Sequence, residues 1–151
     1  MRAVIQRVSE ASVVIDEQKV AAIQQGLLVL LGVEIEDTKE DVVWLANKIG
    51  QLRIFQDEEG VMNKSITESR GEVIVVSQFT LHAKTKKGNR PSYIKAARPE
   101  QAIPLYEQFK EDLSFAISKE VQSGEFGADM KVSLTNDGPV TILIDSRNRD
   151  L

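Results

Sequence analysis

The chain has 151 residues, of which 42% are hydrophobic and 28% charged, a composition typical of one soluble globular domain. It contains no cysteine, which excludes disulfide bonds, a thiolate nucleophile and thiolate-bound metal, and which fits the cytoplasm. The formal net charge of −4 argues against a protein that grips long stretches of nucleic acid, so any such contact should be local. The longest apolar run, Leu27 to Leu31, is far shorter than the ~20 residues of a membrane helix, and we expect no membrane partner.

The first 33 residues have the pattern of β-strands. Apolar and polar side chains alternate over residues 2–8, and an apolar stretch follows at 13–15. A turn is expected near residues 16–19, followed by a second hairpin arm over 20–24 and a fully buried strand over 27–33.

One amphipathic helix is expected over residues 39–49, where apolar side chains recur at helical spacing. Thr38 is expected to cap its start, with Asp41 three positions later, and Gly50 suits the exit from the helix. A short strand at 52–55, a turn at 57–60 and a buried strand at 73–76 follow.

A second helix is expected over about residues 100–122. Pro99 fits its first position, but Pro104 removes a backbone hydrogen bond, so the helix either starts nearer Ile103 or has bent first turns. Two strands, 131–135 and 140–144, are expected to flank Gly138 and Pro139, because a central strand seldom tolerates proline. This order of elements predicts a single α/β domain over residues 1–151 with both helices packed on sheet, ending in a polar tail at 145–151.

Several short segments, taken in their order along the chain, resemble the D-aminoacyl-tRNA deacylase family, also called D-tyrosyl-tRNA deacylases. They are residues 1–8 (MRAVIQRV), 26–33 (GLLVLLGV), 53–55 (RIF), 62–63 (MN), 77–81 (SQFTL), 126–130 (FGADM) and 136–141 (NDGPVT). The resemblance implies a homodimer and a three-layer, barrel-like fold with two β-sheets and two helices on one side. It also implies a hydrolase that cleaves the ester bond of D-aminoacyl-tRNA, and we expect poor discrimination against glycyl-tRNA.

The same resemblance assigns chirality selection to Gly138 and Pro139. It implies that their peptide bond is cis and that the pair enters the active site of a partner subunit, where fixed backbone rejects L-amino acids. Arg7 matches an early arginine of the family and is expected to brace this loop. Apart from the resemblance, a Gly-Pro pair is also compatible with an ordinary surface turn, and Arg7 with a surface arginine.

Side-chain acid–base machinery is not evident in the sequence. His82 is the only histidine, has no acidic neighbour to orient it, and is expected to be exposed or bridged to solvent. No metal-binding motif and no glycine-rich phosphate loop occur, so we expect neither a metal nor a cofactor. Catalysis is therefore expected to depend on positioning and on backbone N–H groups that face the developing oxyanion.

The predicted catalytic segment is Ser77, Gln78, Phe79 and Thr80. Thr80 is the most plausible hydroxyl nucleophile and Ser77 a weaker one, although placing the ester is the more modest role for Thr80, and a strand-end threonine bonded to backbone is the structural alternative. Gln78 can hold the terminal adenosine or polar atoms of the substrate. Phe79 is expected to pack in the core or against the adenine ring.

A basic segment follows directly, with Lys84, Lys86, Lys87 and Arg90. It is either a solvated loop or a surface that contacts the phosphates of the acceptor end of tRNA. Two other functions remain compatible with the sequence: a module that binds the acceptor end without catalysis, and a dimeric structural protein with no role in RNA metabolism.

Overall fold

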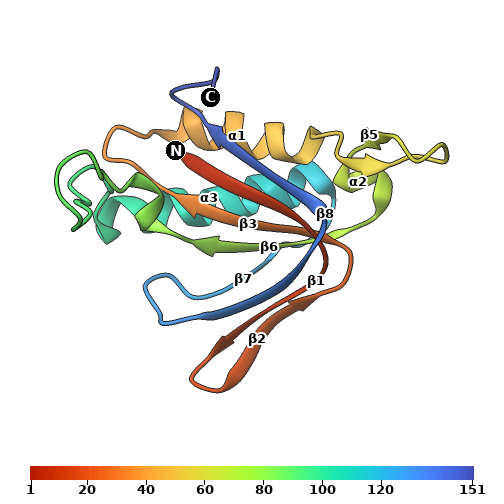
Figure 1. Cartoon of the computed structure of the whole chain (residues 1–151), viewed down its shortest axis with the longest axis horizontal. Coiled ribbons are helices and arrows are strands. Elements are labelled where there is room, and N and C mark those ends of the chain that lie inside the picture. The colour runs from red at the N-terminus through yellow and green to blue at the C-terminus, as the bar shows by residue number, and fades with distance from the viewer.

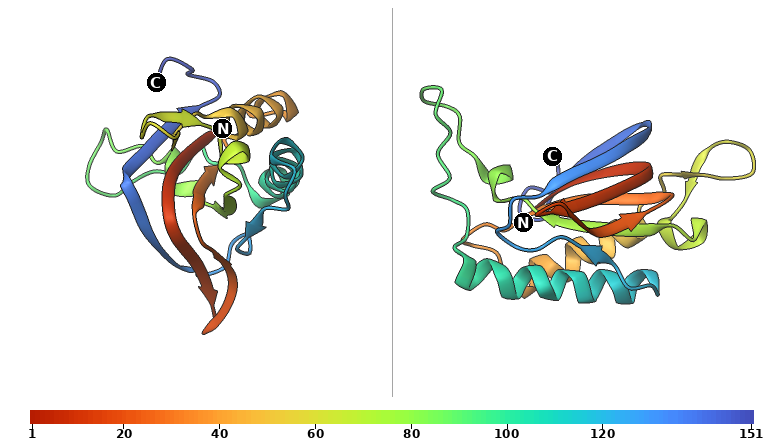
Figure 2. Two further views of the ribbon diagram at one scale, coloured as in Figure 1. Left: turned by 90° about the vertical axis from the view of Figure 1, so that its right-hand side faces the viewer. Right: turned by 90° about the horizontal axis from the view of Figure 1, so that it is seen from below.

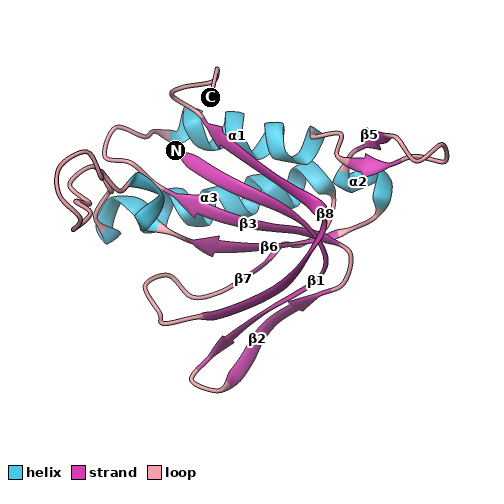
Figure 3. Ribbon diagram, in the orientation of Figure 1, coloured by secondary structure: helices cyan, strands magenta, loops and turns pink.

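The computed structural model describes residues 1–151 and has one large curved sheet at its centre (Figures 1 and 3). The strands of this sheet are β1 (Arg2–Ile15), β2 (Gln18–Ile23), β3 (Gly26–Gly32), β6 (Glu72–Ser77), β7 (Gln122–Ser123) and β8 (Lys131–Asp145). They are ordered β2-β1-β3-β6-β7, and β8 pairs with β1. The β1–β2 hairpin and β8 curl over β3 and β6 to form a nearly closed, barrel-like sheet (Figure 2).

Two long helices cover one face of this sheet (Figure 2). They are α1 (Lys39–Gln51) and α3 (Pro99–Ile117), which pack against each other. A second sheet, of β4 (Phe55–Gln56) and β5 (Met62–Lys64), is small and precedes the one-turn helix α2 (Ile66–Ser69). The predicted single α/β domain is confirmed, with the additional short helix. No helix combines the length and apolarity needed to cross a bilayer.

Strands β3 and β6 are buried on both faces, which divides the hydrophobic core into two parts. Leu27, Val29 and Leu31 belong to the larger cluster, which lies between the sheet and the helices. Leu28 and Ile74 point the other way, into a smaller cluster inside the curled part of the sheet. Because successive side chains of a strand alternate between faces, a continuous apolar run can fill both clusters at once.

The ends of the helices differ in part from the prediction. Thr38 caps α1 in a reciprocal capping box with Asp41, as predicted. Gly50, however, lies inside α1, and Leu52 is the C-cap. A Cβ atom at Gly50 would come within 3.2 Å of the Ala116 side chain, so glycine lets α1 and α3 approach closely. Helix α3 begins at Pro99, as predicted, contains Pro104 and ends at Ile117, about five residues before the expected end. Of the two alternatives for Pro104, a start near Ile103 is therefore wrong.

Strand β8 runs through Gly138 and Pro139 as one element instead of two strands. Asn136 pairs with Val8 and Thr141 pairs with Gln6, so four residues of β8 lie between these pairs where β1 has only Arg7. The three extra residues form a bulge, where proline removes no ladder hydrogen bond. The peptide bond between Gly138 and Pro139 is cis.

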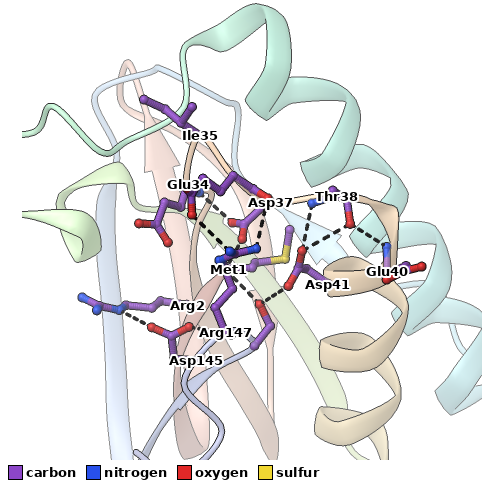
Figure 4. Close-up of polar contacts among 12 residues, drawn as sticks. Met1, Arg2, Glu34, Ile35, Asp37, Thr38, Glu40, Asp41, Asp145 and Arg147 are labelled. Carbon is purple, nitrogen blue, oxygen red and sulfur yellow. Dashed lines mark hydrogen bonds and ion pairs between the residues drawn. The ribbon is translucent and has the colours of Figure 1, made fainter.

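The predicted polar tail over 145–151 begins with the last residue of β8 and is tied to the N-terminus. Asp145 and Ser146 are buried, and the N-terminal ammonium of Met1 donates hydrogen bonds to Ser146 Oγ (3.0 Å) and to Asp37 Oδ1 (2.5 Å) (Figure 4). The Ser146 hydroxyl donates in turn to Asp41 Oδ1 at 2.7 Å. These contacts join the end of β8, the first residue and the start of α1.

Candidate active site

Two motifs that lie far apart in the sequence line one cavity at the end of β6. The cavity has a volume of about 240 Å³, and Ser77, Gln78 and Phe79 form one wall. The opposite wall is the segment from Phe126 to Met130, which connects β7 to β8. The remaining lining residues, Val76 and Val132, extend the apolar interior of the curled sheet into the cavity. The structure therefore brings three of the four predicted catalytic residues together with a second segment that resembles the family.

Helix α3 supports the second wall of this cavity. Tyr106 is fully buried and meets the ring of Phe126 edge to face, with 5.8 Å between ring centroids. Its hydroxyl donates a hydrogen bond to the Val75 carbonyl at 3.2 Å. Burial raises the pKa of Tyr106 to about 12, so the hydroxyl stays protonated as a donor and ties α3 to β6, while its ring packs against the Phe126 wall.

Thr80 does not lie at the end of an extended strand. Residues Phe79–His82 form a single 3₁₀ turn, and the Gln78 side-chain amide donates a hydrogen bond to the Thr80 hydroxyl. The first hydrogen bond within the turn runs from the Leu81 amide to the Gln78 carbonyl at 3.2 Å. The turn itself therefore leaves the amides of Phe79 and Thr80 free, as at the start of any helical segment.

Phe79 does not pack in the core. Its side chain is 53% exposed and meets the ring of Tyr93 edge to face, with 5.1 Å between ring centroids. The expectation of core packing is wrong for a local reason, because the 3₁₀ turn aims the ring away from the strand that precedes it. The alternative expectation, a contact with a base of the substrate, stays a prediction.

His82 is buried, with 4% of its surface exposed, so the expectation of an exposed histidine is wrong, while the alternative of a bridge to solvent stays a prediction. Its Nε2 atom has no hydrogen-bond partner, and its ring packs beside Gly32, where a Cβ atom would lie 3.0 Å from His82 Cδ2. His82 does not line the cavity, and none of the nine lining residues has a titratable side chain. The chemistry open to the cavity is therefore hydrogen bonding and positioning, without a side-chain base.

Gly138 and Pro139, which we call the Gly-Pro pair, are exposed on the bulge of β8. Arg7 lies beneath them and is buried, and its guanidinium donates to the Asp137 carbonyl (2.9 Å) and the Ile54 carbonyl (2.7 Å). Gly138 has a φ of 143°, and a Cβ atom there would come within 3.1 Å of Arg7 Nη2. Arg7 therefore contacts the backbone next to the Gly-Pro pair, and its role in bracing the pair for chirality selection stays a prediction.

Asn136, which was not among the predicted site residues, also holds the bulge. Its Oδ1 atom accepts from the Val140 amide at 2.7 Å, and its Nδ2 atom donates to Gln6 Oε1 (3.1 Å) and Thr141 Oγ1 (3.0 Å). An asparagine two residues before Gly-Pro is a turn-forming signal that could have indicated this role.

The Gly-Pro pair does not lie at the cavity of its own chain. Ser77 pairs with Leu31, which pairs with Ala3 on β1, whereas the Gly-Pro pair lies near the level of Arg7 on β1. Four residues of strand correspond to roughly 13 Å. The β8 residue that lines the cavity is Val132, which lies near the start of the strand, six residues before Gly138. The two parts of the predicted site are therefore apart within one protomer.

The predicted basic segment lies on a loop over residues 83–98, which projects from the end of the sheet (Figure 2). All four of its predicted tRNA-binding side chains, Lys84, Lys86, Lys87 and Arg90, are exposed, and none forms an ion pair. Backbone hydrogen bonds between Lys84 and Ser92, at 2.8 and 3.0 Å, hold the two arms of the loop together. The loop begins directly after the 3₁₀ turn, so the cations lie beyond the Phe79 wall of the cavity.

The sequence is similar to a known protein family and to named proteins over almost its whole length. A family model described as D-Tyr-tRNA(Tyr) deacylase matches residues 4–145. Proteins named D-aminoacyl-tRNA deacylase from Bacteroides fragilis (strain YCH46) and Flavobacterium johnsoniae are 66% and 62% identical over 150 residues, which is 99% of this chain and 100% of each relative.

Two solved structures share the fold. One, titled "c-Myc DNA Unwinding Element Binding Protein", has a TM-score of 0.91 at 41% identity over 96% of this chain and 98% of that chain. The other, titled "Structural Analysis of a probable eukaryotic D-amino acid tRNA deacylase", has a TM-score of 0.82 at 17% identity over 95% and 97%. The sequence matches assign the chain to a class of hydrolases that act on carboxylic ester bonds. The chain belongs to the D-aminoacyl-tRNA deacylase family, which confirms the resemblance found in the sequence.

Proposed function

We propose that this chain works in the cytoplasm as a homodimer that hydrolyses the ester bond of D-aminoacyl-tRNA and of glycyl-tRNA, releasing tRNA and amino acid. The observation that carries the proposal is the cavity, in which Ser77, Gln78 and Phe79 face the 126–130 segment without any titratable side chain. An aminoacyl ester is already labile in water, so holding it correctly is a large part of its catalysis.

The proposed mechanism uses backbone donors and a water molecule. The amides of Phe79 and Thr80, which the 3₁₀ turn leaves free, would donate to the oxyanion that forms when water attacks the ester carbonyl. Thr80, whose hydroxyl accepts from Gln78, would position the ester rather than attack it. The hydroxyl next to the ester on the terminal ribose would activate the attacking water.

Chirality would be selected by the Gly-Pro pair of the second protomer, which would close the cavity from outside. The pair is exposed, is supported by Arg7, and lies too far along the sheet to serve its own cavity. Backbone cannot swing aside as a side chain can, so an L-side chain would collide with it while a D-side chain points to open space. Glycine has no side chain to reject and would therefore be cleaved.

The first test compares matched D- and L-tyrosyl-tRNA as substrates. We expect cleavage of the D-ester and sparing of the L-ester; equal cleavage, or cleavage of neither, contradicts the proposal. Stable binding of D-tyrosyl-tRNA without ester loss in a single turnover would instead support the alternative of a binding module.

Subunit mixing tests the cross-subunit arrangement. One protomer carries Gln78→Ala, which damages its cavity, and the other carries Gly138→Ala, which distorts its bulge because a Cβ atom would lie 2.8 Å from Val140 Cγ2. If the bulge serves the partner, the mixed dimer contains one intact site that spares the L-ester while cleaving the D-ester. If the bulge serves its own chain, neither site is intact and no such activity returns.

A further inference from the structure

The aromatic pair of Phe79 and Tyr93 forms an exposed surface between the cavity and the basic loop. Phe79 is one of the residues that line the cavity, and Tyr93 comes from the far arm of the 83–98 loop. Tyr93 is 39% exposed, Phe79 is 53% exposed, and the planes of their rings are inclined at 76°. Both aromatic side chains are thus partly exposed to solvent, and burial in the hydrophobic core does not explain their position.

The backbone around Tyr93 fixes its position. Its carbonyl accepts from the Ala96 amide at 3.0 Å, while the Ala97 amide donates to the Val33 carbonyl at 2.9 Å. The Ile35 amide donates to the Lys95 carbonyl at 3.0 Å, which ties the same arm to the segment after β3. Tyr93 is therefore presented on an anchored piece of main chain, ready to contact a partner without first being ordered.

The charge around the pair points to an anionic partner. Residues 83–98 contain six cationic side chains and no acidic one, in a chain whose net charge is −4. Lys95 has one weak contact with Glu34, at 3.9 Å, and the other five cations have no ion pair. Those five are Lys84, Lys86, Lys87, Arg90 and Arg98. Exposed aromatic rings beside unpaired cations are the combination that binds single-stranded nucleic acid, because rings stack on bases while cations contact phosphates.

We propose that Phe79 and Tyr93 form a base-stacking subsite for the unpaired nucleotides that precede the terminal adenosine of the substrate. This inference rests on the proposed function, since the ester in the cavity fixes where the terminal nucleotide lies. Phe79 borders the cavity and receives the nearer base, and Tyr93 receives a base one step further from the ester. The cations of the loop then contact the phosphates that lead towards the acceptor stem.

The test asks whether the contribution of Tyr93 to tRNA binding requires the unpaired 3′ nucleotides of the tRNA. Dissociation constants are determined by fluorescence anisotropy at fixed low salt, for intact tRNA and for tRNA trimmed of its unpaired 3′ nucleotides. Stacking contributes about 1–3 kcal/mol per base, so Tyr93→Ala should weaken binding of intact tRNA by about 5- to 150-fold. The trimmed tRNA should bind the wild type and Tyr93→Ala equally.

Two further variants make the result specific. Tyr93→Phe keeps the aromatic face and should restore binding of intact tRNA. Phe115→Ala removes another exposed ring, 90% accessible on α3, and should leave the binding of both tRNAs unchanged. If Tyr93→Ala weakens the binding of intact and trimmed tRNA equally, or weakens neither, the proposed subsite is wrong. A wild type that deacylates D-tyrosyl-tRNA yet shows no dependence on Tyr93 overturns the subsite alone, whereas a wild type that binds no tRNA overturns the proposed function as well.

Discussion

The cations of the loop over residues 83–98 lead to a quantitative prediction for how the affinity for tRNA depends on salt concentration. If Lys84, Lys86, Lys87 and Arg90 each contact one phosphate, the plot of log affinity for tRNA against log salt concentration should have a slope of about −3. Raising the salt from 50 to 200 mM would then weaken binding roughly 60-fold. Replacing Lys86 and Lys87 by glutamine removes two contacts and should reduce the slope to about −1.5 and the loss to roughly 8-fold.

The assay is a titration of labelled tRNA with protein at four or more salt concentrations. The matched control is the double variant Lys19→Gln and Lys48→Gln, which removes the same charge from β2 and α1, two elements outside the loop. It should shift the affinity slightly and leave the slope unchanged. An unchanged slope in the Lys86 and Lys87 variant, or an equal change in the control, would refute phosphate contact as the role of the loop.

Two predictions concern stability. Asp37→Asn removes the fully buried carboxylate that lies 2.5 Å from the Met1 ammonium, and should destabilise the protein by about 3–5 kcal/mol and lower Tm by roughly 6–20 °C, measured by calorimetry. The exposed control Glu36→Gln should cost little, and equal losses would contradict the role of burial. The pKa of Asp145 is raised by burial but lowered overall, because Arg2 Nε donates to it at 2.7 Å and the Arg147 amide at 2.9 Å. The Asp145 carboxylate therefore contributes its full stabilisation at any pH above 3.8, the ordinary pKa of an aspartate. This stabilisation is lost as the pH falls through the lower pKa that Asp145 has in the folded protein. Urea unfolding should show Asp145→Asn to be less stable at pH 7, with a gap that closes towards pH 2, and a gap independent of pH would be evidence against the pairing.

Local patterns predicted much of the framework because local physics decides it. The alternation over residues 2–8 is realised in β1, and the apolar run at 27–33 becomes β3, which is buried on both faces. Thr38 and Asp41 are three residues apart and form their capping box without help from distant parts of the chain. The ordered family segments identified the family, since their residues recur in fixed order whatever the details of packing.

Other features depend on neighbours that are remote in sequence, and these the patterns did not reveal. Gly50 was expected at the helix exit, but α1 continues to Gln51, and what the position requires is room for Ala116 of α3, which a Cβ atom would approach within 3.2 Å. His82 has the polarity of a surface residue, but the 3₁₀ turn folds it against Gly32. The polar residues after β8 look free, but the Met1 ammonium draws Ser146 into a buried network.

For the candidate site, too, some features follow from the sequence and others only from the tertiary structure. From the sequence alone came the prediction that Ser77 to Thr80 and the Gly-Pro pair carry the chemistry, and the fact that the chain has one histidine and no cysteine. Only the tertiary structure decided that Ser77, Gln78 and Phe79 face the 126–130 segment across a cavity, and that the Gly-Pro pair lies on another part of the same sheet. The reason is that residue identity and local spacing are properties of the chain, whereas a cavity exists only where strands distant in sequence are brought together by pairing and by burial of their shared core.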